Sequence, residues 1–501
     1  MNVGYLCYSG MQVGPTEIVL AMDESGDIKD SIPQYLFLAP VFLVPFTIVL
    51  FLMIKFRKKV LFSPFCLIFF IYAIAFIFYK ANGKTLARAQ VYPTRLTIHN
   101  SLNIFPYVIV KRGNFEKVKI PEDAMTNYKI EKIQKETPRI IVLFLGESTN
   151  WADLKLFNDK LNRNTTPKLI EMFNKDSGKN WIKMKAVGSG ICTTSAHPLF
   201  LNIINTPTDV NKIAFSKKQN IYELAKQNGY KTHYFANQPN KYLEISGSKP
   251  EDVIVNESIA HIKSFQTIRD DHLIELFKNL DLSQGKHFVV INNFSCHSVY
   301  EKNWKHQGEE KYNIFTSKEN TEQYKKRDGY HNCLLYWDNL MSQLFEMAKE
   351  KGADYIFFTP DHGEMVSNLD GTICSDKKCK FGHCFMDERV VRIPFLSYSK
   401  DENNFTKMKE YFTQNQITSH YEISKFIAEL FGYKIENPKE CKNEFYVHDG
   451  RALANYKVIK TIREGDKINV VFRGTINELY EKKMNECGAV DKFEPQKDFN
   501  N

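Results

Sequence analysis

The sequence predicts an α/β domain with a mostly parallel sheet flanked by helices, preceded by two transmembrane helices. Two observations predict this architecture. From residue 139 onward, short apolar runs alternate with amphipathic helical patterns, which is typical of chains that fold around a parallel sheet. Before that point, residues 35–54 and 60–79 contain no charged side chain, and each stretch has about the twenty residues that span a bilayer core.

The two apolar stretches fit a membrane better than a soluble core, because neither has a polar face. The loop between them, residues 55–59, carries four cations, and the positive-inside rule places it in the cytoplasm. Both flanks are then extracytoplasmic: residues 1–34 before the first span, and everything after residue 80. Residues 1–34 lack the pattern of a signal peptide. We therefore expect that this chain starts late and that a longer protein has further membrane helices upstream.

Charge and cysteine content restrict the class of protein. The net charge of +9 is modest for 501 residues, and cations and anions are interleaved without the basic stripe of a nucleic-acid-binding protein. We expect no nucleic-acid partner, and at most a weak preference for anionic surfaces such as lipid headgroups. Ten cysteines fit an oxidising compartment. Cys374 and Cys379 are close enough in sequence for a short bridge, with unbridged or differently paired thiols as the alternative.

Beyond the membrane segment (residues 35–80), residues 81–138 form a linker, which either lies along the membrane surface or is an ordinary solvated connector. Residues 139–501 form the main domain. Its expected strands are 140–145, 231–235, 287–291, 355–358 and 394–398, and its expected helices are 220–227, 272–279, 332–351 and 419–431. Ligands of such sheets bind outside the carboxyl ends of the strands, so function is expected there.

Titratable side chains follow several of these strands. Glu147 follows the first, and is either an acid at a helix N-terminus or a ligand. Asp361 and His362 leave the fourth on a turn that contains glycine, and a hard oxygen beside an imidazole suits zinc or manganese. The alternative is a capping aspartate with a packed histidine. His297 and His383 lie in loops, where single histidines are more often surface residues. They indicate a site only if they lie at the same sheet edge as Glu147, Asp361 and His362.

The stretch SGICTTSAHP, residues 189–198, is a second feature of this edge. It contains four potential nucleophiles in a row: Cys192, Thr193, Thr194 and Ser195. Clusters of this kind are usually only loops. Presented to a metal held by Glu147, Asp361 and His362, one of the hydroxyls would lose its proton more easily and become a nucleophile.

Six motifs together resemble the membrane-anchored phosphoethanolamine transferases of the sulfatase and alkaline phosphatase superfamily. They are GES (146–148), the Thr-rich loop that ends at Pro198, CH (296–297), PDHGE (360–364), GH (382–383) and RIPFLSYS (392–399). The resemblance covers roughly residues 12–435 and implies the alkaline-phosphatase/sulfatase-like fold. It also implies a monomer in the bacterial inner membrane whose domain 139–501 lies in the periplasm. The implied reaction transfers phosphoethanolamine from phosphatidylethanolamine to lipid A or the lipopolysaccharide core.

The resemblance assigns roles to the residues of the strand ends. Glu147, Asp361 and His362 match the family's zinc ligands. Thr193, which is five positions before Pro198 as in the family, matches the fourth ligand and nucleophile. The implied mechanism has a covalent phosphoethanolamine-threonine intermediate, which an acceptor hydroxyl or phosphate then resolves.

Three further residues are assigned in the same way. His297 and His383 match histidines that hold the phosphoethanolamine group or a second zinc ion. Glu17, in the segment GPTEIVLAMDES, matches an acidic residue that helps to bind the donor lipid in the periplasmic segment 1–34. The chain also departs from the family, because Gly14 replaces an asparagine of the donor motif and Cys192 has no second cysteine about ten residues later. The segment TNWADLKLF replaces a basic residue after GES, which leaves acceptor recognition open.

Three other functions remain as alternatives. A sulfatase-like hydrolase would need Cys or Ser followed by x-Pro-x-Arg, and the four residues after Cys192, Thr-Thr-Ser-Ala, contain neither the proline nor the arginine. A phosphoglycerol transferase would keep a threonine and similar ligands. A catalytically inactive, membrane-tethered binding protein belongs to another class, and the absence of bound zinc would favour it.

Overall fold

The structure, a computed structural model, describes part of the chain. The described residues are 129–133, 135–175, 179–204, 220–238, 253–255, 270–294, 296–305, 309–374, 381–383, 387–414, 418–436, 444–448, 456–464 and 467–475, with Thr47 and Lys55. The chain divides into two compact units, Met1–Lys119 with Arg451–Leu453 and Ile120–Gly450 with Ala454–Asn501, and every described helix and strand belongs to the second. Within the described residues, no helix combines the length and apolar character that crossing a membrane requires. Apart from Thr47, the predicted spans 35–54 and 60–79 lie outside these residues.

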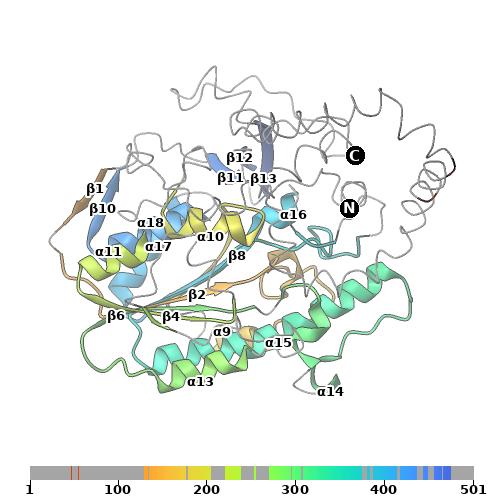
Figure 1. The fold of residues 1–501 in the computed structure, drawn as a ribbon, viewed down its shortest axis with the longest axis horizontal. Coiled ribbons are helices and arrows are strands. Elements are labelled where there is room, and N and C mark those ends of the chain that lie inside the picture. Colours follow the sequence, from red (N-terminus) through yellow and green to blue (C-terminus); the bar gives the residue numbers. More distant parts are fainter. Residues whose placement is uncertain are drawn as a thin grey trace. The chain divides into compact units, whose positions relative to one another are not determined.

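A central sheet of eight strands organises the second unit (Figure 1). Its strands are β2 (Ile140–Gly146), β3 (Trp181–Val187), β4 (Tyr230–Ala236), β5 (Val253–Val255), β6 (Lys286–Asn292), β7 (Tyr355–Pro360), β8 (Arg392–Ser399) and β9 (Thr418–Ser419). Their order is β5-β4-β6-β2-β7-β8-β3-β9. Strand β8 runs antiparallel to both of its neighbours, and the other pairings are parallel. The predicted α/β fold is confirmed, with a mixed rather than purely parallel sheet.

The central strand β2 shows why these residues form a doubly covered sheet. Side chains of a strand alternate between its faces, and β2 is apolar at every position before its terminal glycine. Ile141, Leu143 and Leu145 pack into one hydrophobic cluster, and Ile140, Val142 and Phe144 into the other. An apolar run without alternation is expected for a strand that is buried on both faces.

Helices cover both faces of the sheet (Figure 1). On one face lie α10 (Thr193–Leu201), α11 (Ile221–Gln227), α17 (Glu402–Gln414) and α18 (His420–Leu430). On the other lie α9 (Pro167–Lys175), α13 (Asp271–Asn279) and the long helix α15 (Glu322–Glu350). The short helices are η2 (Trp151–Asp153), η7 (Tyr300–Asn303), α14 (Glu309–Tyr312) and α16 (Glu388–Val391).

Two smaller sheets complete the described elements. Strand β1 (Lys129–Lys132) pairs antiparallel with β10 (Tyr433–Glu436), so residues of the predicted linker 81–138 contact the domain 139–501. Strands β11 (Glu444–His448), β12 (Tyr456–Glu464) and β13 (Lys467–Thr475) form a three-stranded antiparallel sheet.

The structure corrects three expectations from the sequence. The stretch 189–198 is not wholly a loop, because helix α10 begins at Thr193. Thr, Ser and Pro weaken a helical pattern, but Cys192 has the extended backbone of an N-cap and starts the helix. The helix expected over 332–351 begins earlier, at Glu322. The sequence pattern missed its first turns because they bury polar side chains such as Arg327 and His331. Strand β3 escaped prediction because Lys183 and Lys185 interrupt its apolar pattern.

The register of the sheet brings several chain segments to one edge. Gly146 at the end of β2 lies opposite Pro360 at the end of β7, and Leu145 lies opposite Asn292 at the end of β6. Because β8 runs the other way, its first residue, Arg392, pairs with Val187 at the end of β3. The residues that follow these strands therefore start from one edge, as the sequence predicted for a functional site.

Candidate metal centre and active site

Glu147 is the first residue after β2 and is 1% exposed. Its Oε1 accepts a hydrogen bond from the hydroxyl of Ser148 at 2.7 Å. Its Oε2 accepts one from the hydroxyl of Thr193 at 3.3 Å and a second from the side-chain amide of Gln238. A buried carboxylate is costly unless it is hydrogen-bonded or binds a cation, so this site is built around a negative charge.

Asp361 and His362 follow β7, and both are 0% exposed. Oδ1 of Asp361 accepts hydrogen bonds from the backbone N–H groups of Ser148 at 3.2 Å and His362 at 2.7 Å. Among the residues that the structure describes, no group donates a hydrogen bond to Oδ2 of Asp361. Nε2 of His362 lies 3.3 Å from this oxygen. The same Nε2 lies 3.3 Å from Oε1 of Glu147. The imidazole thus faces two carboxylates at once.

Thr193 joins this group as the first residue of α10. Its hydroxyl lies 3.3 Å from Oε2 of Glu147 and 3.4 Å from Nε2 of His362. The side chain is 7% exposed. The unpaired N–H groups at the start of a helix favour anions, so a phosphoryl oxygen near Thr193 would be stabilised there.

The distances among these four residues test whether a zinc ion fits. Zinc prefers four tetrahedral ligands at about 2.0–2.1 Å, which places ligand atoms about 3.3 Å apart. Four contacts measure 3.3–3.4 Å: Thr193 to Oε2 of Glu147, His362 to Oε1 of Glu147, Thr193 to His362, and His362 to Oδ2 of Asp361. The oxygen and nitrogen donors are also of the types that zinc binds. The donor types and these contact distances therefore fit a zinc ion.

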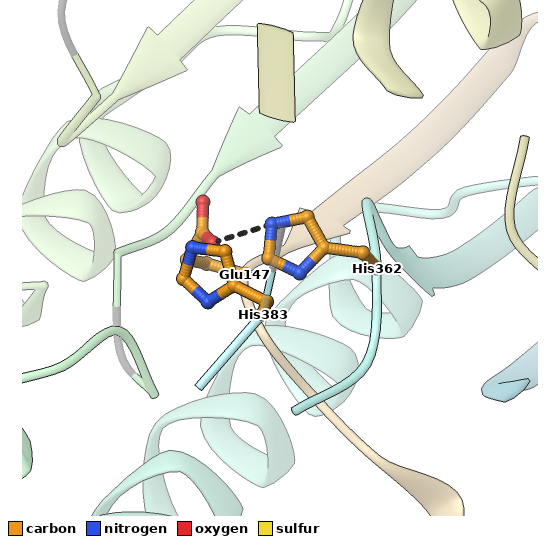
Figure 2. A group of neighbouring side chains, drawn as sticks. All are labelled: Glu147, His362 and His383. Carbon is orange, nitrogen blue, oxygen red and sulfur yellow. Dashed lines mark ion pairs between the residues drawn. The ribbon is translucent and has the colours of Figure 1, made fainter. Parts of the chain in front are cut away.

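His383 adds a second imidazole beside this cluster (Figure 2). Ligand atoms of Glu147, His362 and His383 all lie within 4.8 Å of one another. The rings of His362 and His383 have their centroids 4.3 Å apart. Nδ1 of His383 lies 2.7 Å from Oε2 of the buried Glu364, which also accepts a hydrogen bond from the hydroxyl of Tyr300. This carboxylate orients the His383 ring toward the site.

His297 lies beside His383, with ring centroids 5.4 Å apart. Its ring stacks on Phe294 at 4.6 Å. The segment that carries it is fixed by Asp270, whose Oδ1 accepts hydrogen bonds from the backbone N–H of Phe294 at 3.0 Å and from the amide of Asn237. His297 and His383 thus line one side of the cluster and could contact a charged substrate group.

The two buried carboxyl groups differ in their protonation. Burial alone would raise the pKa of Glu147, but His362, His297, His383 and the hydrogen bond from Gln238 outweigh it and hold this pKa at about 2. Burial and the charge of Glu147 raise the pKa of Asp361 well above its ordinary value. The surroundings therefore favour the charged form of Glu147 and disfavour that of Asp361, and a bound cation would favour the charged form of both.

A comparison with known families identifies the domain. The family model for sulfatases matches residues 139–433. The chain belongs to the sulfatase family. No curated protein matches it.

Two solved structures share the fold of this sulfatase-family domain, and a third has a lower similarity to it. The C-terminal periplasmic domain of EcEptC from Escherichia coli, in complex with zinc, has a TM-score of 0.51 at 20% identity, over 64% of this chain and 92% of that chain. A second structure of that domain has a TM-score of 0.51 at 19% identity, over 68% and 98%. The integral membrane protein lipooligosaccharide phosphoethanolamine transferase A (EptA) from Neisseria meningitidis has a TM-score of 0.48 at 16% identity, over 69% and 66%.

The structure brings most of the predicted site residues of this sulfatase-family chain together. Glu147, Thr193, Asp361 and His362 form the cluster, with His297 and His383 beside it. Glu17 lies outside the described residues. Cys192 and Cys374 are both disulfide-bonded. Cys379 lies outside the described residues, so a bridge between it and Cys374 stays a prediction.

Sequence reasoning gave no role to four residues that shape the site. Ser148 has a left-handed backbone with φ 49°, which is uncommon for a non-glycine residue and often found at functional sites. Tyr330 of α15 donates to its carbonyl oxygen at 2.8 Å. Gln238 and Glu364 contact Glu147 and His383 directly. The position of Gln238 just after β4 could have identified it as a site residue, because ligands bind beyond the ends of such strands. No sequence pattern indicated a role for Tyr330.

Proposed function

We propose that this protein is a zinc-dependent phosphotransferase that moves phosphoethanolamine from phosphatidylethanolamine to a cell-envelope acceptor, lipid A or the lipopolysaccharide core. The observation that supports this proposal most directly is the position of the Thr193 hydroxyl, 3.3 Å from Oε2 of Glu147 and 3.4 Å from Nε2 of His362. Membership of the sulfatase family supports transfer or hydrolysis at such a site. The choice of phosphoethanolamine rests on the sequence motifs.

The residues of the cluster suit a nucleophilic displacement at phosphorus. Zinc, when bound, would lower the pKa of a hydroxyl and neutralise charge on phosphoryl oxygens. The Thr193 hydroxyl donates to Oε2 of Glu147, so its proton has an acceptor and its oxygen is held toward the site. Attack on the lipid phosphate would form a phosphothreonine ester and break the bond to the diacylglycerol oxygen, which leaves with a proton. His297 and His383 line the side from which the headgroup would be held.

The second step would regenerate the threonine. An acceptor hydroxyl or phosphate oxygen attacks the same phosphorus atom, gives up its proton and displaces the Thr193 oxygen. The start of α10 favours the negative charge that develops in both steps. Transfer rather than hydrolysis requires that the acceptor reaches the intermediate before water does.

The setting of this reaction belongs to the same proposal. The donor and acceptor are both membrane components, which fits a chain anchored by residues 35–80 in the inner membrane with residues 139–501 in the periplasm. Glu17 in segment 1–34 would then contribute to donor binding. We also propose that the protein acts as a monomer with one zinc ion, and that His297 and His383 take either the substrate or a second zinc.

Two of the alternative functions are less compatible with the described site. A sulfatase would need the proline and arginine that are missing after Cys192. An inactive binding protein would have no need for a buried nucleophile within 3.4 Å of an imidazole between two carboxylates. A phosphoglycerol transferase would use the same constellation, so the donor has to be identified directly.

A Thr193→Ala variant tests the nucleophile. Loss of the attacking oxygen should reduce transfer by at least about a thousandfold, since removal of a covalent nucleophile has effects of this size or larger. Zinc should largely remain bound, because three ligands are kept. The measurement is release of diacylglycerol from phosphatidylethanolamine vesicles by the full chain, with zinc content by elemental analysis. Thr194→Ala is the matched control, and loss of activity in this variant alone would show that the wrong threonine was assigned.

Mass spectrometry of the enzyme incubated with donor tests the intermediate and the donor together. The peptide that contains Thr193 should carry phosphoethanolamine. A phosphoglycerol adduct would replace the proposed donor with its closest competitor. An adduct on Ser195, or none in active enzyme, would contradict the mechanism. Comparison of envelope lipids from cells with and without the protein would then identify the acceptor.

A further inference from the structure

His420 connects two segments of the site that are far apart in the sequence. It is the first residue of α18 and is 0% exposed. Strand β9, directly before it, pairs with the end of β3, where Ser419 lies opposite Val187. This pairing brings His420 between the segment that leads into α10 and the end of β7.

The hydrogen bonds of His420 define its tautomer. Nδ1 lies 3.1 Å from the backbone nitrogen of Ser189 and must accept, because an amide N–H only donates. Nε2 lies 2.8 Å from the carbonyl oxygen of Pro360 and must donate, because a carbonyl oxygen only accepts. The neutral imidazole with its proton on Nε2 satisfies both. It therefore bridges two backbones that sheet hydrogen bonds do not join directly.

On one side, the bridge continues to the nucleophile. The Ser189 hydroxyl donates to the carbonyl oxygen of Ala196 in α10 at 3.1 Å. The turn between them is tight, because a Cβ atom on Gly190 would lie 2.3 Å from the hydroxyl oxygen of Ser195. A displacement of Ser189 would therefore be transmitted to the start of α10, where Thr193 lies.

On the other side, the bridge continues to the metal ligands. Pro360 immediately precedes Asp361, whose backbone N–H donates to the carbonyl oxygen of Gly146 at 3.0 Å. The position of Pro360 thus determines where β7 ends and where the side chains of Asp361 and His362 begin. His420 itself contacts none of the four clustered side chains through a hydrogen bond recorded among the described residues.

We propose that His420 is a positioning residue that holds the Thr193 hydroxyl at its working distance from Asp361 and His362. The inference rests on the proposed function, since it concerns the same zinc-dependent transfer. If the bridge is lost, the Thr193 hydroxyl should shift away from Glu147 and His362, which it now approaches to 3.3 and 3.4 Å. Zinc affinity and the rate of the first step should then fall together, whereas KM for the donor should change little.

Three substitutions separate the two halves of the bridge. His420→Asn places an amide group near the position of Nδ1 and keeps the contact to Ser189. His420→Gln places an amide group near the position of Nε2 and keeps the contact to Pro360. His420→Leu keeps neither hydrogen bond. His287→Leu is the control for loss of a buried histidine, because His287 is 3% exposed but pairs with Ile140 at the opposite end of the sheet.

The experiment measures zinc affinity of the full chain by competition with a chelator, and diacylglycerol release from phosphatidylethanolamine vesicles. Loss of a residue that orients ligands typically costs 10–100-fold in metal affinity or activity. We expect zinc affinity and diacylglycerol release to fall by roughly this factor in His420→Leu, and by less in His420→Asn and His420→Gln. The zinc affinity of His287→Leu should stay close to that of the wild type. If His420→Leu does not fold, the comparison of Asn, Gln and wild type remains.

Three results would overturn the inference: a zinc affinity of His420→Leu equal to the wild type, equal losses in His420→Leu and His287→Leu, or no advantage of Asn and Gln over Leu. A wild-type protein that binds zinc but forms no phosphoethanolamine adduct would contradict the proposed function alone. The zinc comparison among the variants would still decide the role of His420 in that case.

Discussion

The chemistry of the site is decided by the immediate neighbours of single residues. Glu147 and Asp361 are both fully buried carboxyl groups, yet the pKa of Glu147 is lowered to about 2 and that of Asp361 is raised. Glu147 faces three imidazoles and accepts a hydrogen bond from Gln238, while Asp361 faces the charge of Glu147. Residue type alone therefore does not define a ligand, because its charge depends on what surrounds it.

Substitution of Gln238 tests this dependence. Gln238→Leu removes the amide donor from Oε2 of Glu147, so the pKa of Glu147 should rise and zinc affinity should fall by roughly tenfold. Zinc competition at pH 7 measures the change. Gln227→Leu is the control, since Gln227 contacts Tyr433 at 3.4 Å, outside the cluster. An unchanged affinity in Gln238→Leu would show that the amide does not support the ligand.

Contacts between elements determine where helices begin. Helix α9 starts at Pro167, and its first free N–H groups are satisfied by a side chain of another helix. Asp338 of α15 accepts hydrogen bonds from the backbone N–H groups of Lys168 at 2.7 Å and Leu169 at 2.9 Å. Its pKa is raised to about 7, because burial outweighs these two bonds. This capping contact fixes α9 on α15.

The raised pKa of Asp338 predicts a pH-dependent stability. The folded protein holds the proton of Asp338 more tightly than the unfolded chain does. The stabilisation that this proton gives the folded state is therefore complete below pH 3.8 and is lost as the pH rises to about 7. Asp338→Asn cannot ionise. The free energy of unfolding of Asp338→Asn minus that of the wild type should therefore increase by up to about 4 kcal/mol from pH 4 to pH 8.

Urea denaturation over that pH range measures the difference between the two proteins. Asp281→Asn, at an exposed carboxylate that accepts a hydrogen bond from Ser283, should show no such gain. The opposite trend, with the wild type gaining on Asp338→Asn as the pH rises, would contradict the raised pKa. It would mean that the N-terminus of α9 stabilises the carboxylate more than burial destabilises it.

At the scale of the whole molecule, the site exists only because the sheet is complete. Its ligands come from the ends of β2 and β7 and the start of α10, and the loop at residues 381–383 supplies His383 beside them. An unfolded chain would not hold these groups within 3.4 Å of one another. Metal binding at such a site adds to the stability of the fold as a whole.

Zinc should therefore raise the melting temperature of the protein. At a free concentration of about 1,000 times Kd, a ligand specific to the folded state adds about 4 kcal/mol, which corresponds to a shift of several degrees. Differential scanning fluorimetry with zinc or with a chelator measures it. In Glu147→Gln the zinc-dependent part of the shift should be much smaller. An equal shift in this variant would place the bound zinc elsewhere.

Local patterns were sufficient to predict the architecture. The strands expected over 140–145, 231–235, 287–291, 355–358 and 394–398 all form. Residues 140–145 are wholly apolar, and a short apolar run of this kind is typical of a strand buried on both faces. Position after a strand also singled out Glu147, Asp361 and His362, since parallel strands expose their last residues at one edge. These inferences need only the order of residues along the chain.

Only the tertiary structure decided which residues meet. The lysines of β3 concealed that strand, whose pairing with β8 and β9 is not encoded in any local period. The bonds from Gln238 to Glu147 and from His420 to Ser189 and Pro360 join residues 60 to 231 positions apart. Such contacts depend on the register of the sheet and on packing of whole elements, which a linear pattern does not specify.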